Sequence, residues 1–306
     1  MNVLMITGDR NLLDENSGAS KRLALQRSAV DRLDVVYWGQ DALTKAFRVR
    51  GAYDVVTSQD PLWRGLVALY LARKLGATLN VQVHLDLKSL SWLRYRLART
   101  ILLRADTIRV VSQRLREAVE EMGSKAKVVV LPVFVDVSRF RSIGERAAKT
   151  NASKTILWTG RFEEEKNPQE ALRIFTSVKG AGIEAELVML GDGSMDGSLR
   201  ALAQKIEGVR FPGWQDPLPY LKSADVVVCT SRHESWGASI VEALAAGVPV
   251  VAPDVGIAKD AGAVVVERDK LAEAVIDILK RTEKGTLKLT LLPASEWAEA
   301  WRNSLI

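Results

Sequence analysis

The chain is poor in the residues that cross-link small folds through disulfides or metals. Its 306 residues include one cysteine and two histidines. Cys229 has no partner for an internal disulfide and lies in an apolar segment, so we expect a packed free thiol in a reducing compartment. The sequence contains no cysteine and histidine cluster with metal-ligand spacing, so we expect neither a metal nor another cofactor.

Long apolar runs are also missing. The longest fall far short of the ~20 residues that a helix needs to cross a bilayer. The first residues predict a strand followed closely by acidic and polar side chains, which differs from a secretory signal. The sequence shows no repeat of 20–50 residues. A hydrophobic content of 47% can supply two cores, so we expect a globular protein with two domains. The reducing compartment expected for Cys229 implies a cytoplasmic protein, either free or peripheral on the inner face of the membrane.

The sequence instead shows a regular alternation of strand and helix patterns, which predicts an α/β fold with two doubly wound, Rossmann-like parallel sheets. The expected strands of the first half are residues 2–7, 34–38, 54–57, 77–83, 106–112 and 127–132. Those of the second half are residues 154–160, 185–191, 225–230 and 248–252. Polar residues 142–154 read as a linker, so we place the domains at 1–142 and 143–306.

The most informative segment follows the expected strand 225–230. Glu234 lies in a loop, and a helical pattern from Ala238 to Ala246 is stopped by Gly247. Glu242 lies about one turn inside this helix, roughly 12 Å along the axis from Glu234 if the rise is helical throughout. The backbone N–H groups at the helix start have no partner within the helix.

A loop acid, free N–H donors and a second acid suit a ligand with an anionic middle and hydroxyls at both ends, such as a nucleotide-sugar. Its phosphates would face the positive end of the helix, near Gly237, Ala238 and Ser239. The carboxylates would accept hydrogen bonds from sugar and ribose hydroxyls. The alternative is an ordinary βαβ unit with two solvated acids.

Two other expected strands end in residues that could lie beside a ligand, and only the first carries cations. The first ends at Gly160 and Arg161, and Lys166 follows; an arginine fork and a lysine point charge both suit phosphate oxygens. Pairing of Lys166 with Glu163, Glu164 or Glu165 is the alternative. The second ends in the turn Gly191-Asp-Gly193. Ligands in open α/β sheets bind outside the carboxyl ends of the strands, so these residues can converge with Glu234 and Glu242.

Together, the patterns E-x7-E followed by G-x-P-V, G-R-x4-K-N and G-D-G resemble glycosyltransferase family 4, retaining enzymes of the GT-B fold that include glycogen synthases and mannosyltransferases. The resemblance is strongest over residues 150–255. It implies transfer of a hexose or related sugar from a UDP- or GDP-sugar to a glycan or lipid-linked acceptor, without a metal. It implies a donor domain at the carboxyl end and an acceptor domain at the amino end.

The resemblance also implies roles for individual residues. Arg161 and Lys166 would hold the diphosphate, Glu242 the ribose, and Glu234 the sugar hydroxyls. His84, at the end of an expected strand, would meet the donor sugar from the first domain. Glycines and loop residues would allow close approach of the ligand: Gly18, Gly160, Gly191, Gly193, Trp236, Gly237 and Ala238. Ser235 stands where relatives often have glycine, and Gly18 stands alone where a glycine pair is frequent.

Charge is unevenly distributed, with a net charge of +10 over residues 1–150 and −4 over the remainder. A basic acceptor domain favours a phosphorylated or lipid-linked acceptor or an anionic membrane surface. A helical pattern over residues 87–104 would put Leu90, Leu93, Leu97 and Ile101 on one face. The opposite face would carry Lys88, Trp92, Tyr95, Arg96 and Arg99. We therefore expect membrane contact through residues 88–99, with a solvated face as the alternative.

Other interpretations stay open. A catalytically silent GT-B subunit would bind nucleotide without needing Glu234, and a nucleotide-sugar epimerase would act without an acceptor. Glycoside hydrolysis by two carboxylates is disfavoured because Glu242 is helical and far from Glu234. No nucleic-acid-binding motif is present. The helix expected at about 294–306 would pack toward the first domain, as in the family, or on its own domain.

Overall fold

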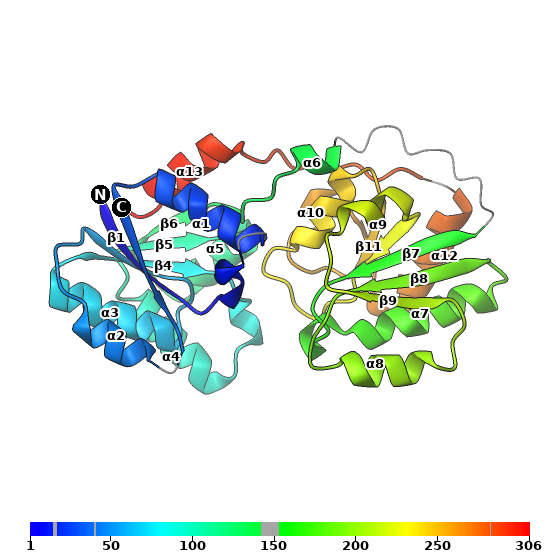
Figure 1. The fold of residues 1–306 in the computed structure, drawn as a ribbon, viewed down its shortest axis with the longest axis horizontal. Coiled ribbons are helices and arrows are strands. Elements are labelled where there is room, and N and C mark those ends of the chain that lie inside the picture. The colour runs from blue at the N-terminus through cyan, green and yellow to red at the C-terminus, as the bar shows by residue number, and fades with distance from the viewer. Residues whose placement is uncertain (15–16, 40, 142–152, 282) are drawn as a thin grey trace. The chain divides into compact units, whose positions relative to one another are not determined.

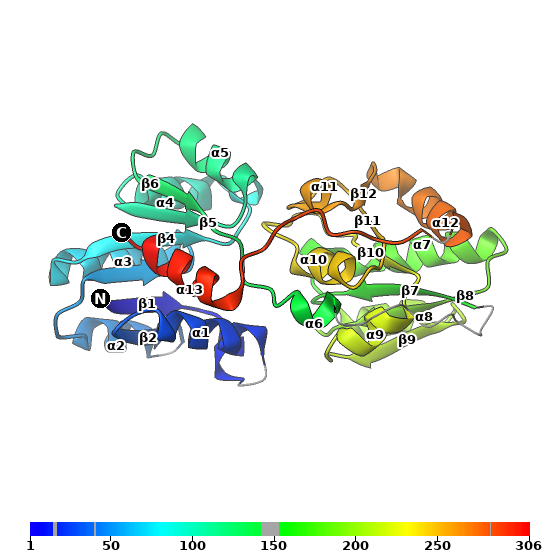
Figure 2. The same cartoon turned by 90° about the horizontal axis from the view of Figure 1, so that it is seen from above.

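The computed structural model describes residues 1–14, 17–39, 41–141, 153–281 and 283–306. The chain divides into two compact units. Unit 1 comprises Met1–Phe134 and Leu291–Ile306, and unit 2 comprises Val135–Thr290. Each unit contains a six-stranded parallel sheet with helices on both faces (Figures 1 and 2). The predicted α/β class with two doubly wound sheets is confirmed.

The sheet of unit 1 has the order β2-β1-β3-β4-β5-β6. Its strands are β1 (Asn2–Thr7), β2 (Arg32–Tyr37), β3 (Val55–Ser58), β4 (Thr78–Val83), β5 (Thr107–Val110) and β6 (Lys127–Val130). The central strands are almost completely buried, because helices cover both faces, and this explains their continuous apolar runs. Each strand lies within about two residues of its predicted ends.

Helices α1 and α13 cover one face of this sheet, and α2 and α3 cover the other (Figure 1). The helices are α1 (Gly18–Ser28), α2 (Ala42–Arg48), α3 (Trp63–Leu75), α4 (Trp92–Leu102), α5 (Gln113–Glu121) and α13 (Ala294–Asn303). Two 3-10 turns, η1 (Arg10–Leu13) and η2 (Leu87–Ser89), precede α1 and α4. Local capping sets several ends: Ser17 accepts from the Ser20 N–H at the start of α1, and Gly76 ends α3 in the left-handed region.

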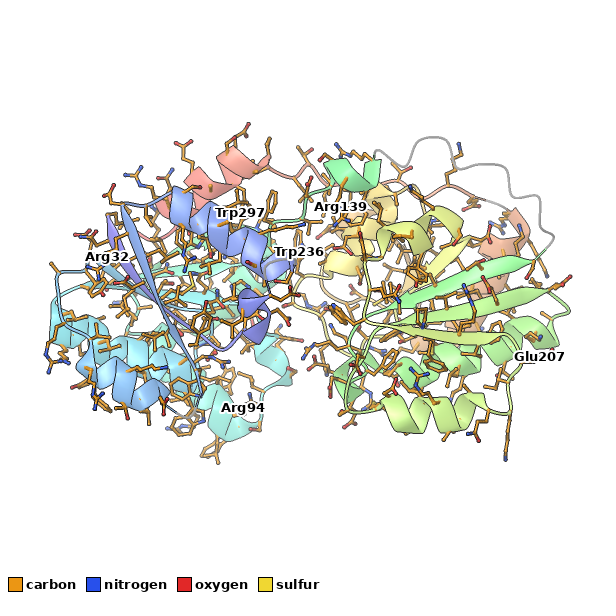
Figure 3. The ribbon with its side chains drawn as sticks, viewed as in Figure 1. Arg32, Arg94, Arg139, Glu207, Trp236 and Trp297 are labelled. Carbon is orange, nitrogen blue, oxygen red and sulfur yellow. The ribbon has the colours of Figure 1, made fainter. Side chains whose placement is uncertain are left out.

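Helix α13 packs in unit 1. Trp297 and Trp301 lie in one hydrophobic cluster with Val3 and Met5 of β1 (Trp297 is labelled in Figure 3). The Trp297 indole also donates to the Pro132 carbonyl at 2.8 Å. The structure therefore places the terminal helix with the first sheet, where the sequence left two alternatives.

The division of the chain lies after Phe134, earlier than the expected boundary at 142–143. The short helix α6 (Ser138–Arg141) belongs to unit 2, where Arg139 forms an ion pair with Asp216 at 2.5 Å. Unit 2 also ends at Thr290 rather than at residue 306. Most of the expected linker, residues 142–152, lies outside the described residues.

The expected continuous helix over residues 87–104 is wrong. Leu90 and Ser91 have extended backbones that separate η2 from α4, and Asp86 accepts from the Lys88 N–H at the start of the turn. Leu93, predicted on the same face as Ile101, is 71% exposed beside Trp92, which is 67% exposed. The face of α4 that is buried contains Ala98, Ile101 and Leu102.

The sheet of unit 2 has the order β12-β11-β10-β7-β8-β9. Its strands are β7 (Lys154–Thr159), β8 (Ala185–Leu190), β9 (Val209–Gly213), β10 (Val226–Val228), β11 (Val250–Ala252) and β12 (Val264–Val265). Strands β9 and β12 were not predicted. Both lie at sheet edges, where β9 tolerates Pro212 and the exposed Arg210, so its sequence lacks an apolar run.

Helices α7 and α8 lie on one face of this sheet and α9 and α10 on the other (Figure 1). The helices of the unit are α7 (Pro168–Gly180), α8 (Asp196–Ala203), α9 (Leu218–Ser223), α10 (Ala238–Ala245), α11 (Ala258–Ala261) and α12 (Leu271–Arg281), with 3-10 turns η3 (Glu164–Lys166) and η4 (Arg268–Lys270). The apolar stripe of α7 packs on β7 and β8, and that of α12 packs on β10 and β11 and against α7. The shared hydrophobic cluster includes Phe162 and Phe175.

Candidate functional site

The site of unit 2 lies where the strand order reverses. Strands β7 and β10 are central neighbours, β8 and β9 follow on one side, and β11 and β12 on the other. In open α/β sheets this switch point, outside the carboxyl ends of the strands, is where ligands bind. The loop after β7 carries Gly160, Arg161 and Lys166, and the loop after β10 carries Glu234.

Lys166 and Glu234 come together from these two loops. The Lys166 ammonium Nζ lies 2.6 Å from Glu234 Oε1, and both side chains are largely buried. The Ser231 hydroxyl donates to the same carboxylate oxygen at 2.8 Å. The alternative partners expected for Lys166 were the neighbouring glutamates, and the structure instead pairs it with the second predicted site residue.

Arg161 forms a more exposed pair with Glu165, four residues along the loop. Arg232, from the β10 loop, pairs with Glu164 at 3.1 Å. These pairs border an open cavity of about 460 Å³, and the remaining lining residues are Glu163 and His233. Exposed ion pairs contribute little to stability, so a phosphate group could compete for Arg161 at low cost.

The glycines after β7 and β8 have a packing role. A Cβ on Gly191 would lie 1.9 Å from the Gly160 carbonyl oxygen, and a Cβ on Gly193 would lie within 3 Å of the Phe162 backbone. The Phe162 N–H also donates to the Asp192 carbonyl at 2.7 Å. These glycines therefore allow the two loops to touch, which by itself explains their presence.

The start of α10 lacks a side-chain cap. Gly237 occupies the N-cap position with φ of 100°, a conformation that favours glycine, and it supplies no side-chain acceptor to the first turn. Trp236 is 5% exposed, and its indole nitrogen has no hydrogen-bond partner. Ala238 is the first helical residue, and Glu242 lies partly buried one turn further along. A helix start of this kind suits an anionic group.

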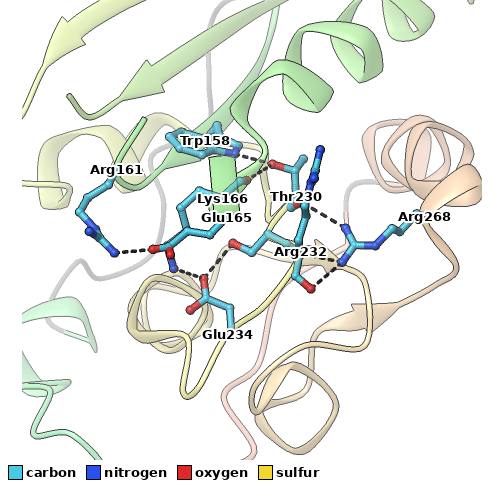
Figure 4. Close-up of polar contacts among 9 residues, drawn as sticks. Trp158, Arg161, Glu165, Lys166, Thr230, Arg232, Glu234 and Arg268 are labelled. Atoms are coloured by element: carbon cyan, nitrogen blue, oxygen red, sulfur yellow. Dashed lines mark hydrogen bonds and ion pairs between the residues drawn. The ribbon is translucent and has the colours of Figure 1, made fainter. Parts of the chain in front are cut away.

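A polar network supports this edge of the sheet (Figure 4). The Trp158 indole donates to Thr230 Oγ1 at 2.9 Å, and that hydroxyl lies 2.9 Å from the carbonyls of Lys166 and Asn167. Arg268, from η4, donates to three carbonyls of the β10 loop. The sequence analysis missed Thr230, Ser231 and Arg268. Ser231 lies only three residues before Glu234, so its contact could have been anticipated from the sequence. No local pattern links Arg268 to this loop.

The two remaining predicted residues belong to unit 1. Gly18 is the first residue of α1, and His84 follows β4 with its Nε2 3.4 Å from Gln82 Oε1. Burial, with the nearby charges of Arg109 and Arg22, holds the pKa of His84 well below its ordinary value of 6.5. His84 is therefore a neutral imidazole at neutral pH.

Arg109 of β5 is a buried cation, and its charge acts on His84. Its guanidinium donates to the carbonyls of Leu131 and Pro132 and to Gln82 Oε1, and it lies over the Trp297 ring. Burial lowers the pKa of Arg109 to about 9. These contacts connect β4, β5 and α13, so the role of Arg109 is structural.

Among the described residues, no group of three or more His, Cys, Asp or Glu side chains could hold a metal ion. No helix in the described ranges is both long and apolar enough to cross a bilayer.

Solved structures with the same architecture define the fold class. HepE of Anabaena, solved in complex with UDP and glucose, matches with a TM-score of 0.71 and 16% identity, covering 99% of this chain and 94% of that chain. The lipopolysaccharide outer core galactosyltransferase WaaB, in its apo form, matches with a TM-score of 0.70 and 15% identity, covering 99% of both chains. With its two doubly wound units, the chain has the GT-B glycosyltransferase fold.

The sequence comparisons identify the family. The family model described as "Glycosyl transferases group 1" matches residues 153–281, and the one described as "Glycosyl transferase 4-like domain" matches residues 4–133. The chain belongs to the glycosyltransferase 4-like family, so the predicted family resemblance is confirmed.

One relative is the alpha-monoglucosyldiacylglycerol synthase of Streptococcus pneumoniae. It is 27% identical over 239 residues, which are 68% of this chain and 54% of the synthase. The chain spans about half the length of the curated relatives it matches, with aligned regions of 38% to 65% of their lengths.

Proposed function

We propose that the protein transfers a hexose or related sugar, with retention of anomeric configuration, from a nucleotide diphosphate sugar to an acceptor. The observation that carries the proposal is the Lys166–Glu234 pair beside Arg161 at the switch point of unit 2. A cation and a carboxylate held together can bind a diphosphate and a sugar hydroxyl of one donor.

In this proposal Arg161 and Lys166 bind the diphosphate and stabilise the charge that develops on it as the sugar leaves. The uncapped start of α10, from Trp236 to Ala238, supports the phosphates or sugar. Glu242 holds the ribose, and Glu234 orients the sugar hydroxyls. Neutral His84 is a hydrogen-bond partner for the donor sugar, and Gly18 allows close approach. The cations and the helix end would supply the charge stabilisation without a divalent metal.

The acceptor proposed is a lipid-linked or growing surface glycan. Support comes from the basic first half of the chain and from relatives named for lipid acceptors. One is the GDP-mannose-dependent monoacylated alpha-(1-6)-phosphatidylinositol monomannoside mannosyltransferase of Corynebacterium glutamicum, 29% identical over 201 residues, 57% of this chain and 53% of that enzyme. The alpha-monoglucosyldiacylglycerol synthase of Streptococcus pneumoniae is likewise named for a glucosylated lipid.

Contact with an anionic membrane through residues 88–99 belongs to the same proposal. Helix α4 exposes Trp92 and Leu93 together with Arg94, Arg96 and Arg99, and contains no acid (Arg94 is labelled in Figure 3). Basic side chains mixed with exposed aromatic and aliphatic ones are typical of surfaces that meet lipid headgroups. The neighbouring helix α3 exposes Trp63, Leu66 and Tyr70 in a stripe at helical spacing.

Thermal unfolding with a panel of UDP-, GDP- and ADP-sugars and the free diphosphates tests the donor proposal. A ligand at 100 times its Kd should stabilise the protein by about 2.7 kcal/mol. A shift with one nucleotide class supports a diphosphate site and identifies the base. The absence of a shift with every nucleotide, including in the presence of anionic vesicles, would contradict the proposal.

Turnover with and without acceptor mixtures separates the alternatives. A transferase consumes the donor only when an acceptor is present, and proton NMR of the product should show the anomeric configuration of the donor. An epimerase converts the donor alone, and a silent subunit binds nucleotide without consuming donor. The relatives are named as transferases and synthases, which favours the first outcome.

A further inference from the structure

Arg268 makes a set of contacts that none of the motifs predicts. It begins the 3-10 turn η4, which joins β12 to α12. Its guanidinium reaches the loop after β10, where Nη1 donates to the Thr230 carbonyl at 3.3 Å. Nη2 donates to the carbonyls of Ser231 at 2.8 Å and Arg232 at 3.0 Å (Figure 4). Three consecutive carbonyls are thus bound by one side chain.

The opposite side of the loop is fixed by the segment that follows β7. The Arg232 N–H donates to the Glu165 carbonyl at 2.8 Å. Thr230 Oγ1 lies 2.9 Å from the carbonyls of Lys166 and Asn167. The loop after β10 is therefore held between the β7 loop and the guanidinium of Arg268. Residue 230 is bound through its hydroxyl and its carbonyl, and residue 232 through its N–H and its carbonyl.

This loop determines where Glu234 lies. The Ser231 hydroxyl donates to Glu234 Oε1 at 2.8 Å, and the Lys166 ammonium lies 2.6 Å from the same oxygen. Because Arg268 holds the Ser231 carbonyl, it fixes the residue that provides one of these two donors. We infer that Arg268 is a positioning residue, which clamps the β10 loop so that Ser231 keeps the Glu234 carboxylate in its orientation toward the donor sugar.

The chemistry of the contact favours arginine. A planar guanidinium carries its donors on separate nitrogens in a fixed fork, which matches acceptors spread along a backbone. A lysine ammonium concentrates its donors on one atom and cannot span the three carbonyls in the same way. Arg268 as a whole is exposed, so apolar packing does not explain its position. The consequence for turnover rests on the proposed function, whereas the clamp itself does not.

Amide hydrogen exchange of the ligand-free protein tests the clamp without any assay of activity. Arg268→Gln should accelerate exchange over residues 230–236, because the loop loses three hydrogen bonds from a cation. Arg210→Gln is the matched control, since Arg210 is an exposed arginine of the same unit that pairs with Glu186 at 3.1 Å on β8. Unchanged exchange in Arg268→Gln would overturn the inference.

Kinetics then test whether Arg268 affects turnover by positioning Glu234. Arg268→Gln should lower kcat/KM for the nucleotide-sugar roughly 10- to 100-fold, the scale on which a misplaced group acts. The affinity for the free nucleoside diphosphate, which has no sugar, should stay within about twofold of wild type because the diphosphate groups are untouched. Arg268→Lys should recover only part of the loss. A loss of affinity for the free diphosphate as large as the loss in kcat/KM would contradict an effect of Arg268 through Glu234.

A double-mutant cycle with Ser231→Ala isolates the connection. If Arg268 acts through Ser231, the combined variant should lose about as much kcat/KM as the more damaging single variant. Fully additive losses would overturn this route. If wild-type protein shows no transfer while Arg268→Gln accelerates loop exchange, the clamp is supported and the proposed function is contradicted, so the two failures are distinguishable.

Discussion

The Lys166 ammonium and the Glu234 carboxylate form an ion pair of 2.6 Å, although 68 residues separate them in the chain. The pair joins the two loops that end the central strands of unit 2. It also places opposite charges at one point before any ligand is present. A donor that binds both groups would therefore enter a site whose charges are already balanced.

Removing one member of this pair should destabilise the protein. Lys166→Met leaves the largely buried Glu234 carboxylate without its cation, at a cost of about 2 kcal/mol in the free energy of unfolding, after a discount for partial exposure. Urea denaturation measures the change. The combined variant with Glu234→Gln should cost less than the sum of the two single changes. Equal stability of Lys166→Met and wild type would show that the pair is not formed in solution.

The same two variants should differ in function. Glu234→Gln should lose transfer by roughly 100-fold or more, in the range expected when a group that acts on the transition state is removed. Its affinity for the nucleoside diphosphate should be retained, because Lys166 and Arg161 remain. Calorimetric titration measures the affinity for the nucleoside diphosphate, and initial rates measure the transfer. Wild-type turnover in Glu234→Gln would contradict the role proposed for this residue.

Arg161 and Glu165 should have opposite effects on nucleotide binding. Their exposed pair occupies the guanidinium that the diphosphate needs. Arg161→Gln should weaken nucleoside diphosphate binding about tenfold, since one charge-assisted contact contributes on the order of 1.4 kcal/mol. Glu165→Gln should strengthen binding by about twofold because it removes the competing carboxylate. Weaker binding in both variants would show that Glu165 holds Arg161 in its binding position.

Stability should fall below pH 6.5 because of His84. Its pKa in the folded protein is held well below 6.5, so the unfolded chain binds more protons in this window. The free energy of unfolding is therefore unaffected by this group above pH 6.5 and decreases as the pH falls from 6.5 toward the folded-state pKa. Tm measured from pH 7.5 to 5 should show this slope, and His84→Gln should flatten it. An unchanged slope in the variant would assign the effect to other groups.

The two tryptophans Trp297 and Trp92 provide a matched test of packing. Trp297 is buried at 3% exposure, donates to Pro132 and lies against Arg109. Trp297→Ala should destabilise the protein by about 3–5 kcal/mol. Trp92 is 67% exposed on α4, so its replacement by alanine should lower the free energy of unfolding by less than about 0.5 kcal/mol. Similar losses in chemical denaturation would contradict the packing of α13 in unit 1.

Binding to anionic vesicles should depend on α4. Wild-type protein should sediment with vesicles that contain phosphatidylglycerol, and the combined variant Arg96→Glu and Arg99→Glu should not, because each basic residue near such a surface contributes about 1 kcal/mol. Arg210→Gln is a control on unit 2. Equal binding of wild type to neutral phosphatidylcholine vesicles would contradict an electrostatic contact.

Much of the fold followed from local sequence. Near-continuous apolar runs predicted β1 and β7, and the stop at Gly247 predicted the end of α10, because burial on both faces and helix termination leave strong local patterns. The edge strands β9 and β12 were missed, because an edge strand is short and tolerates polar residues and proline. Helix α4 began later than predicted, because the extended backbone at Leu90 and Ser91 interrupts a pattern that periodicity alone would continue.

The sequence alone determined the family, the two doubly wound sheets and the set of candidate residues, because these depend on spacing within single strand–loop–helix segments. Only the tertiary structure decided how those residues combine. It paired Lys166 with Glu234 rather than with its neighbouring acids, brought Arg268 to the β10 loop, and placed α13 in unit 1. Such pairings join segments far apart in the chain, and the order of strands in a sheet, which no local pattern encodes, determines which loops meet.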